Sequence, residues 1–238
     1  MSKPLAFIQI GEPPLAVLSR VGQQSDWFID SLSLAHAQLI IYRPDLNEPL
    51  PLPTTFCGAI ITGSWAMVTH LHSWGEAVAN WIRSAHKSSL PLFGVCYGHQ
   101  LIAHAPGGIV GVNPCGSEQG LQLIELCGDY QNEPLLKHIP QRISAWLSHQ
   151  QTVLKVPVDA KVMGFSALDE CQIIKYSDTT FSVQFHPEFS LSIMIEYLNY
   201  NEETYLLPDS NLLPVWPKTI LQRFYQYSCA EPEYPLMH

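Results

Sequence analysis

Short apolar runs and amphipathic stretches alternate along the first part of the chain. The apolar runs are typical of buried strands, and they lie at residues 5–10, 38–42, 57–61 and 90–95. Amphipathic helices are predicted between them at residues 27–35 and 74–86, where apolar side chains recur at helical spacing. Strands that alternate with helices in this way form a mostly parallel, twisted sheet with helices on both faces. We therefore expect an α/β fold.

The pattern changes after a third helix, which is predicted at residues 99–104. Shorter apolar runs, separated by turn residues, follow at residues 107–112, 119–126, 143–147 and 172–176. They predict a small, partly antiparallel extension that returns the chain to a buried strand at residues 181–185. Further helices are expected at residues 191–198 and 220–227, and irregular structure at the proline-rich segments 44–53 and 201–217. We expect residues 1–238 to form a single domain.

Composition narrows the class of protein. Of the 238 residues, 47% are hydrophobic, and the net charge of −9 argues against nucleic acid as a partner. No apolar run is long enough to span a membrane, and no targeting segment precedes the first predicted strand. The cysteines are widely spaced, so we expect reduced thiols in a cytoplasmic protein; they stand at positions 57, 96, 115, 127, 171 and 229.

Cys96 lies where a predicted strand runs directly into a predicted helix. Glycines stand two residues before it and two after it, at Gly94 and Gly98. This G-x-C-x-G spacing is the thiol version of a nucleophile elbow, a sharp turn that needs glycine on both sides of the nucleophile. The helix N-terminus favours a thiolate there, so Cys96 is a candidate nucleophile. The alternative from the motif alone is a buried, inert cysteine.

A second candidate motif follows the strand at residues 181–185. His186 comes directly after this strand, and Glu188 follows one residue beyond Pro187. A thiol nucleophile needs a base to take its proton, and the base needs a third group to orient it. We therefore expect Cys96, His186 and Glu188 to form a catalytic triad, against the alternative of an ordinary surface turn at His186.

Together these motifs resemble the class I (triad) glutamine amidotransferase family, in the form of a stand-alone, GMP-synthase-like glutaminase domain. The segments that carry the resemblance are Gly94-Val95-Cys96-Tyr97-Gly98-His99-Gln100, Gln184-Phe185-His186-Pro187-Glu188, Ile61-Thr62-Gly63-Ser64, Gly107-Gly108 with Gly116, Glu118 and Gly120, and Trp146-Leu147-Ser148-His149. The resemblance implies a flavodoxin-like fold. It also implies attack of Cys96 on the γ-carboxamide of glutamine or of another γ-glutamyl compound, with release of ammonia.

The resemblance also implies roles around the nucleophile. Gly63 and Tyr97 are expected to supply the backbone N–H groups of an oxyanion hole, since charge develops on the carbonyl oxygen during attack. The residues expected to contact the substrate are Ser64, Gln100, Ser148 and His149. Gln151 departs from the family pattern, which usually has Asp two residues after this His. This departure removes a charge near the expected pocket. How closely the substrate matches free glutamine therefore stays open.

Three functions remain open at this stage. The first is a glutaminase whose ammonia passes to a separate synthetase subunit, because this chain has no room for a synthetase domain. The second is a free-standing hydrolase of γ-glutamyl peptides or amides with the same triad. The third is a non-catalytic, glutamine-binding regulatory subunit. No cofactor is expected, and no metal site either, because the His70 and His72 pair lacks a third ligand at suitable spacing.

Overall fold

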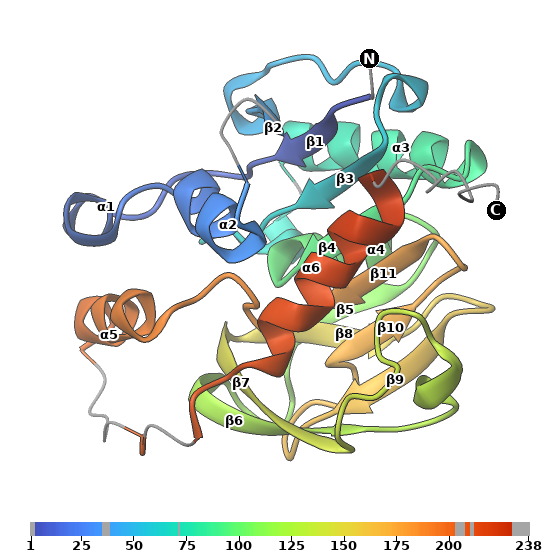
Figure 1. Ribbon diagram of the computed structural model, residues 1–238. Coiled ribbons are helices and arrows are strands. Elements are labelled where there is room, and N and C mark those ends of the chain that lie inside the picture. The colour runs from blue at the N-terminus through green and yellow to red at the C-terminus, as the bar shows by residue number, and fades with distance from the viewer. Residues whose placement is uncertain (1–2, 35–38, 71, 203–207, 210–211, 230–238) are drawn as a thin grey trace, which may run out of the picture.

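The central feature of the computed structural model is a nine-stranded sheet with helices packed against it (Figure 1). The structure describes residues 3–34, 39–70, 72–202, 208–209 and 212–229. The strand order in the sheet is β2-β1-β3-β4-β11-β10-β9-β6-β7. A separate antiparallel pair is formed by β5 (Ile109–Val112) and β8 (Gln151–Lys155).

One half of the sheet is parallel. Its strands are β2 (Leu39–Tyr42), β1 (Leu5–Ile8), β3 (Gly58–Ile61), β4 (Leu92–Val95) and β11 (Thr180–Val183), in that spatial order. Neighbouring pairs within this group are all parallel. Their carboxyl ends therefore lie along one edge, which is where open α/β sheets bind ligands.

Alternating side chains of these strands pack into two separate cores. In β1, Phe7 joins a core that includes Phe28 of α2 (Gln24–Leu32) and Phe224 of α6 (Trp216–Cys229). Ile8 joins the core on the opposite face, with α3 (Ser73–Lys87) and α4 (Tyr97–His104). A strand buried on both faces reads as a continuous apolar run, which is why the pattern predicts these strands.

The other half of the sheet is antiparallel. It consists of β10 (Ile173–Lys175), β9 (Lys161–Phe165), β6 (Glu118–Leu126) and β7 (Arg142–His149). The predicted α/β fold, with a mostly parallel sheet and an antiparallel extension, is confirmed. The extension is continuous with the parallel half rather than a separate layer.

Several elements differ from the sequence prediction. Helix α1 (Leu15–Val21) and strands β8 and β9 were not predicted. Helix α5 (Leu191–Tyr200) begins where expected, and α6 extends beyond its predicted ends at both sides. The segment 44–53 holds the short 3-10 helix η2 (Pro44–Leu46), and η3 (Pro53–Thr55) begins at its end. The first predicted helix, at residues 27–35, is α2, which begins earlier, at Gln24, and ends at Leu32. The segment 201–217, predicted to be irregular, includes the start of α6 at Trp216. Residue 35, the start of the strand at residue 38 and part of the segment 201–217 lie outside the described residues.

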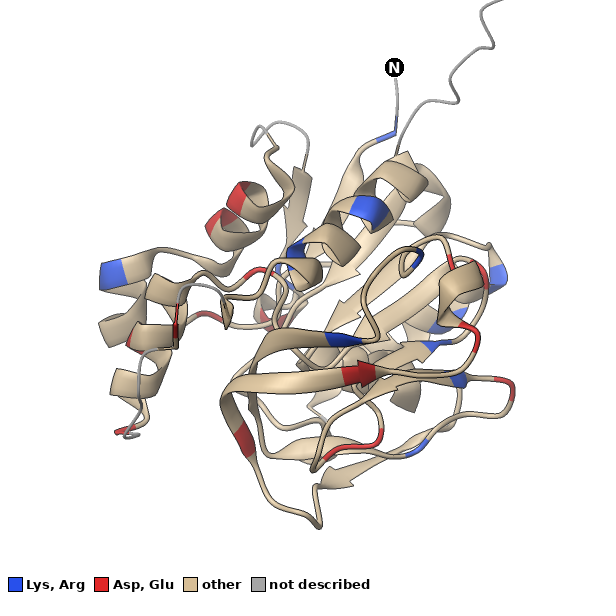
Figure 2. Cartoon of the chain, turned by 60° about the horizontal axis from the view of Figure 1, so that its bottom comes forward, with Lys and Arg blue, Asp and Glu red and all other residues tan. Residues whose placement is uncertain are grey.

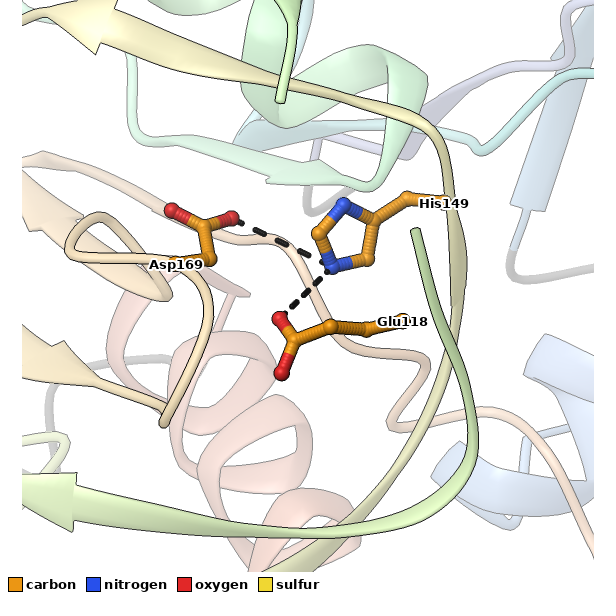
Figure 3. Close-up of side chains that lie close together, drawn as sticks. All are labelled: Glu118, His149 and Asp169. Carbon is orange, nitrogen blue, oxygen red and sulfur yellow. Dashed lines mark hydrogen bonds and ion pairs between the residues drawn. The ribbon is translucent and has the colours of Figure 1, made fainter. Parts of the chain in front are cut away.

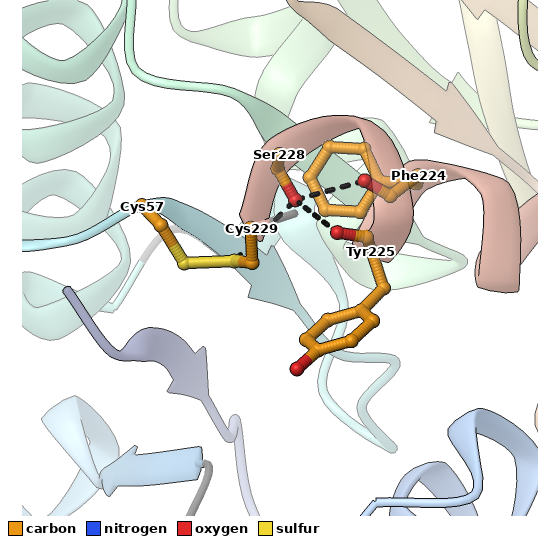
Figure 4. Close-up of a disulfide and its surroundings, with 5 residues drawn as sticks. All are labelled: Cys57, Phe224, Tyr225, Ser228 and Cys229. Carbon is orange, nitrogen blue, oxygen red and sulfur yellow. Dashed lines mark hydrogen bonds between the residues drawn. A yellow bond between two sulfur atoms is a disulfide. The ribbon is translucent and has the colours of Figure 1, made fainter. Parts of the chain in front are cut away.

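The expectation of six reduced cysteines is wrong for one pair. Cys57, just before β3, forms a disulfide with Cys229, at the end of α6 (Figure 4). The two residues are 172 positions apart, so only the packing of α6 along the sheet brings them together. The other four cysteines, at positions 96, 115, 127 and 171, are free thiols. Because the reduced state of all six supported a cytoplasmic location, that location stays a prediction.

Charged side chains are dispersed over the molecule. In the described part of the chain, Lys and Arg positions are spread over several elements and interspersed with Asp and Glu (Figure 2). No helix among the described residues is long and apolar enough to cross a membrane.

Candidate active site

Three segments converge at the carboxyl edge of the parallel strands. β4 lies between β3 and β11, with Gly94 opposite Ile61 of β3 and Val95 opposite Val183 of β11. Gly63 lies on the segment that follows β3, Cys96 on the one that follows β4, and His186 on the one that follows β11. The amide of Cys96 donates to the carbonyl of Val183 at 2.9 Å, so the end of β4 is tied to the end of β11.

Cys96 occupies the sharp turn that its flanking glycines predict. Its φ is 51°, in the region that L-residues rarely adopt, and α4 begins at the next residue. A side chain on Gly94 would lie 2.6 Å from the carbonyl oxygen of Gly98, and one on Gly98 would collide with the carbonyl oxygen of Ile61. The turn therefore requires glycine at both positions, and it places the sulfur at the N-terminus of a helix.

His186 and Glu188 form a buried pair beside Cys96. The Nδ1 of His186 lies 2.7 Å from Oε1 of Glu188, and both side chains are almost fully buried. The His186 ring also stacks on Phe189, with ring centroids 4.0 Å apart. Burial alone lowers the pKa of His186, but the neighbouring Glu188 carboxylate and the charge of the Cys96 sulfur raise that pKa to about 10. An imidazolium ion is thus favoured next to the sulfur.

Gly63 packs directly against this group. A side chain built on Gly63 would lie 3.0 Å from Cε1 of His186 and 3.5 Å from Cβ of Cys96. The Gly63 backbone can therefore approach the two side chains as no other residue could. On the other side, the Tyr97 amide lies in the first turn of α4, where N–H groups lack an intrahelical partner.

A cavity of about 330 Å³ opens beside Cys96, at the lower end of the range for ligand pockets. The four residues predicted to contact the substrate, together with Cys96 and Tyr97, all line it: Ser64, Gln100, Ser148 and His149. The carbonyl oxygen of Ser148 lies 3.9 Å from the Cys96 sulfur. The turn between β7 and β8 completes the wall. It joins the antiparallel half of the sheet to the separate β5–β8 pair.

Gln151 ties several parts of this wall together. Its side chain donates to Oγ1 of Thr69 and accepts from the Thr69 amide at 3.4 Å. The backbone carbonyl oxygen of Gln151 accepts from Nε2 of Gln100 at 2.7 Å and lies 3.0 Å from Nδ1 of His149. Gln100 Nε2 also donates to Oε1 of Gln184 at 2.9 Å. One residue thereby links the segment after β3, helix α4 and strand β8.

A family model described as Glutamine amidotransferase class-I matches residues 24–201, which include the elbow, the His186–Glu188 pair and the cavity wall. The chain belongs to this family. The match covers most of the chain and agrees with the resemblance that the motifs show.

Two proteins that this amidotransferase resembles in sequence are described as subunits of a glutamine-hydrolyzing GMP synthase. A glutamine-hydrolyzing GMP synthase subunit from Methanocaldococcus jannaschii is 36% identical over 114 residues, which cover 48% of this chain and 58% of the relative. The protein of the same name from Sulfurisphaera tokodaii is 28% identical over 176 residues, which cover 73% of this chain and 88% of the relative. This chain thus spans somewhat more than half the length of the first of these relatives.

Solved structures agree with the fold. A glutamine amido transferase from Methylobacillus flagellatus superposes with a TM-score of 0.76 over 100% of both chains, at 19% identity. A protein from Thermoplasma acidophilum, described as a GMP synthase subunit, gives 0.62 over 85% of this chain and 98% of its own, at 17% identity. At these identities the likeness concerns the fold alone.

The amidotransferase also holds a buried polar group that sequence reasoning missed (Figure 3). Nε2 of His149 lies 3.1 Å from Oε2 of Glu118 and 3.9 Å from Oδ2 of Asp169, and all three side chains are about 1% exposed. Oε2 of Glu118 also accepts from Ser166 and Gln172. The three groups lie close enough to hold a metal ion. In this structure, however, Glu118 and His149 are hydrogen-bonded to protein groups. Their contact fixes the position of His149 in the cavity wall.

Proposed function

We propose that this protein hydrolyses the γ-carboxamide of glutamine, with Cys96 as nucleophile, His186 as acid and base, and Glu188 as the residue that orients His186. The observation that carries the proposal is the packing of Gly63 against both Cys96 and His186, while Oε1 of Glu188 lies 2.7 Å from Nδ1 of the same ring. These contacts support the roles of nucleophile, base and orienting carboxylate for three residues that lie beside the cavity lined by Cys96.

The first half of the reaction forms a thioester. The Cys96 thiolate attacks the carboxamide carbon, and the carbonyl oxygen becomes negatively charged. The amides of Gly63 and Tyr97 stabilise that charge. His186, as imidazolium, donates its proton to the leaving nitrogen as the C–N bond breaks, and ammonia departs. Glu188 holds the ring through Nδ1, so the opposite nitrogen serves the reaction.

The second half regenerates the enzyme. Neutral His186 now takes a proton from water, and the resulting hydroxide attacks the thioester carbonyl. The C–S bond breaks, glutamate leaves, and the sulfur returns to the thiolate beside the imidazolium. The residues that act are the same in both halves, and only the direction of proton transfer changes.

Gln100 supports the orientation of the substrate. Both hydrogens of its amide nitrogen are donated within the protein, to Gln151 and Gln184. Gln100 therefore keeps its Oε1 as an acceptor for the substrate, and the N–H of a charged α-amino group or of an acylated one can donate to it alike. This arrangement favours a substrate that enters with its carboxamide toward Cys96.

The names of the relatives support a separate partner for the ammonia. Because they are subunits of GMP synthase, we extend the two-subunit arrangement to this chain and propose that the acceptor is held by a separate synthetase subunit. Purification of the chain from native extract, followed by identification of an ATP-dependent synthetase that co-purifies, tests this partner. Recovery of the chain alone at physiological concentrations would argue for the free-standing γ-glutamyl hydrolase.

The central test measures ammonia release from glutamine together with labelling of Cys96. The wild type is expected to release ammonia and to be alkylated at Cys96 by a glutamine-directed chloroketone, with glutamine protecting it. The Cys96→Ser variant should do neither, while it keeps the fold by circular dichroism. A folded wild type that is neither labelled nor active would favour the non-catalytic, glutamine-binding subunit instead. Faster turnover of γ-glutamyl dipeptides than of glutamine would favour the hydrolase.

A further inference from the structure

The wall of the cavity is polar but carries almost no charge. None of its lining residues in the described part of the chain is Asp, Glu, Lys or Arg. The histidine on this wall, His149, has both ring nitrogens engaged by protein oxygens, those of Gln151 and Glu118. The wall thus offers the substrate amide, hydroxyl and backbone dipoles, and no free carboxylate or cation.

Gln151 is a neutral wall residue whose side chain is held in place by burial and hydrogen bonds. It is 4% exposed, and its amide makes two hydrogen bonds to Thr69. A glutamate has the same shape and could keep both contacts, because a carboxylate accepts from the Thr69 amide and from its hydroxyl. The side chain's contacts therefore do not require an amide, but the amide leaves the wall uncharged.

The cavity also fixes which end of a substrate faces inward. Cys96 is buried, whereas Gln150 on the same wall is exposed and Asn201 is half-buried. The γ-carboxamide must reach Cys96, so the α-amino and α-carboxyl groups lie toward the open end. Substituents on those groups extend toward solvent rather than into the protein.

We propose that the cavity recognises the γ-carboxamide and does not select for the charges on the α-carbon. Derivatives of glutamine that are substituted at the α-amino group, the α-carboxyl group or both are therefore substrates. This inference rests on the proposed function, whose reaction it leaves unchanged. A pocket that pairs directly with a substrate charge loses more than about thirtyfold in affinity when that charge is removed. A neutral wall does not.

Four compounds test the proposal, each with a single γ-carboxamide from which ammonia can leave. They are L-glutamine, Nα-acetyl-L-glutamine, L-glutamine α-methylamide and Nα-acetyl-L-glutamine α-methylamide, which are respectively zwitterionic, anionic, cationic and neutral. Values of kcat/KM from ammonia release are expected to agree within tenfold. A preference of more than tenfold for glutamine over all three derivatives overturns the proposal. Absence of turnover for all four, with Cys96 unlabelled by the chloroketone, overturns the proposed function as well.

A pair of variants tests the role of Gln151. Gln151→Glu keeps the shape and adds a charge, so the ratio of kcat/KM for the cationic over the anionic derivative is expected to rise at least tenfold. Gln151→Met removes the contacts with Thr69 without adding charge, so both values should fall together and their ratio should stay within threefold of wild type. A ratio that Gln151→Glu leaves unchanged, or that Gln151→Met shifts as far, contradicts the inference.

Discussion

At the scale of single residues, the decisive interaction is the one between His186 and Glu188. Burial lowers the pKa of His186, and the Glu188 carboxylate is the leading contribution that raises it, to about 10. The proposed imidazolium is thus maintained first by the charge of Glu188 and then by that of the Cys96 sulfur. Without the Glu188 charge, burial would weigh more heavily and the pKa of His186 would fall.

We predict that Glu188→Gln lowers kcat/KM for glutamine by about 10²–10⁴-fold and moves the alkaline limb of its pH profile to lower pH. The profile is measured from ammonia release between pH 6 and 11. An alkaline limb that stays in place in the variant would contradict the role given to Glu188.

The same pair predicts a pH dependence of stability. The folded pKa of His186, about 10, lies above the value of about 6.5 for an unfolded chain. Its contribution to stability is therefore fully present below about pH 6.5 and is lost as the pH rises toward 10. The difference in unfolding free energy between wild type and Glu188→Gln should shrink over this range in urea titrations. A difference that is constant with pH would refute the shift.

Gly63 makes a further prediction at this scale. In Gly63→Ala the new methyl group would lie 3.0 Å from the His186 ring and 3.5 Å from Cβ of Cys96, so the ring must shift from its present place beside the sulfur. We expect kcat to fall by about 10²–10³-fold, comparable to the loss of an oxyanion donor. Thermal unfolding serves as the control, since the substitution should change stability little by comparison. A variant that keeps its kcat would show that this close approach has no catalytic role.

Sequence patterns predict some of these residues better than others. Cys96, Gly63, His186 and Glu188 each follow an apolar strand, and parallel strands bring such positions to one edge. The contact of His149 with Glu118 and Asp169 has no such signal. Pairing of β6 with β7 brings Glu118 opposite His149, and Asp169 reaches them from the segment between β9 and β10.

At the scale of elements, the elbow between β4 and α4 depends on Gly98. A side chain there would collide with the carbonyl oxygen of Ile61, which is backbone and cannot move aside cheaply. We predict that Gly98→Ala destabilises the fold by about 3 kcal/mol, at the upper end of the usual cost of overpacking. Chemical denaturation measures the change.

Gly111→Ala is a matched control for this prediction. Its new methyl group would lie 2.6 Å from Cδ1 and 3.5 Å from Cγ of Leu154, whose side chain is flexible and half-exposed. Its cost should stay below about 1 kcal/mol, because that side chain can rotate away. Equal losses in the two variants would mean that the elbow has no special steric requirement.

The elements that the sequence pattern misses share a physical cause. Strand β8 begins with the polar residues Gln151 and Thr152 and ends exposed, so it contains no continuous apolar run. Helix α1 buries only Val17, and no side chain caps its N-terminus. Central strands and amphipathic helices bury a full face and leave a clear period, whereas these peripheral elements are fixed by contacts with the rest of the fold.

At the scale of the whole molecule, the site depends on both halves of the sheet. The parallel half carries Cys96 and His186, the proposed nucleophile and base, and the close-packed Gly63. Strand β7 of the antiparallel half supplies Ser148, and β8 of the separate pair supplies Gln151. The amide of His186 donates to the carbonyl of Trp146 in β7 at 2.8 Å. The chemistry is thus set by the part with the strongest sequence pattern, and the substrate wall by the part with the weakest.

The disulfide between Cys57 and Cys229 acts at the same scale, because it joins the start of β3 to the end of α6. Helix α6 covers the core formed by Phe7, Phe28 and Phe93, so its attachment stabilises one whole face of the sheet. We predict that Cys57→Ser lowers the unfolding free energy by about 2–4 kcal/mol and Tm by about 4–16 °C. Reductant should lower the Tm of wild type and leave that of the variant unchanged. The control is Cys115→Ser, which removes an exposed free thiol and should leave Tm unchanged. Six titratable thiols in the native, unreduced protein, rather than four, would contradict the prediction.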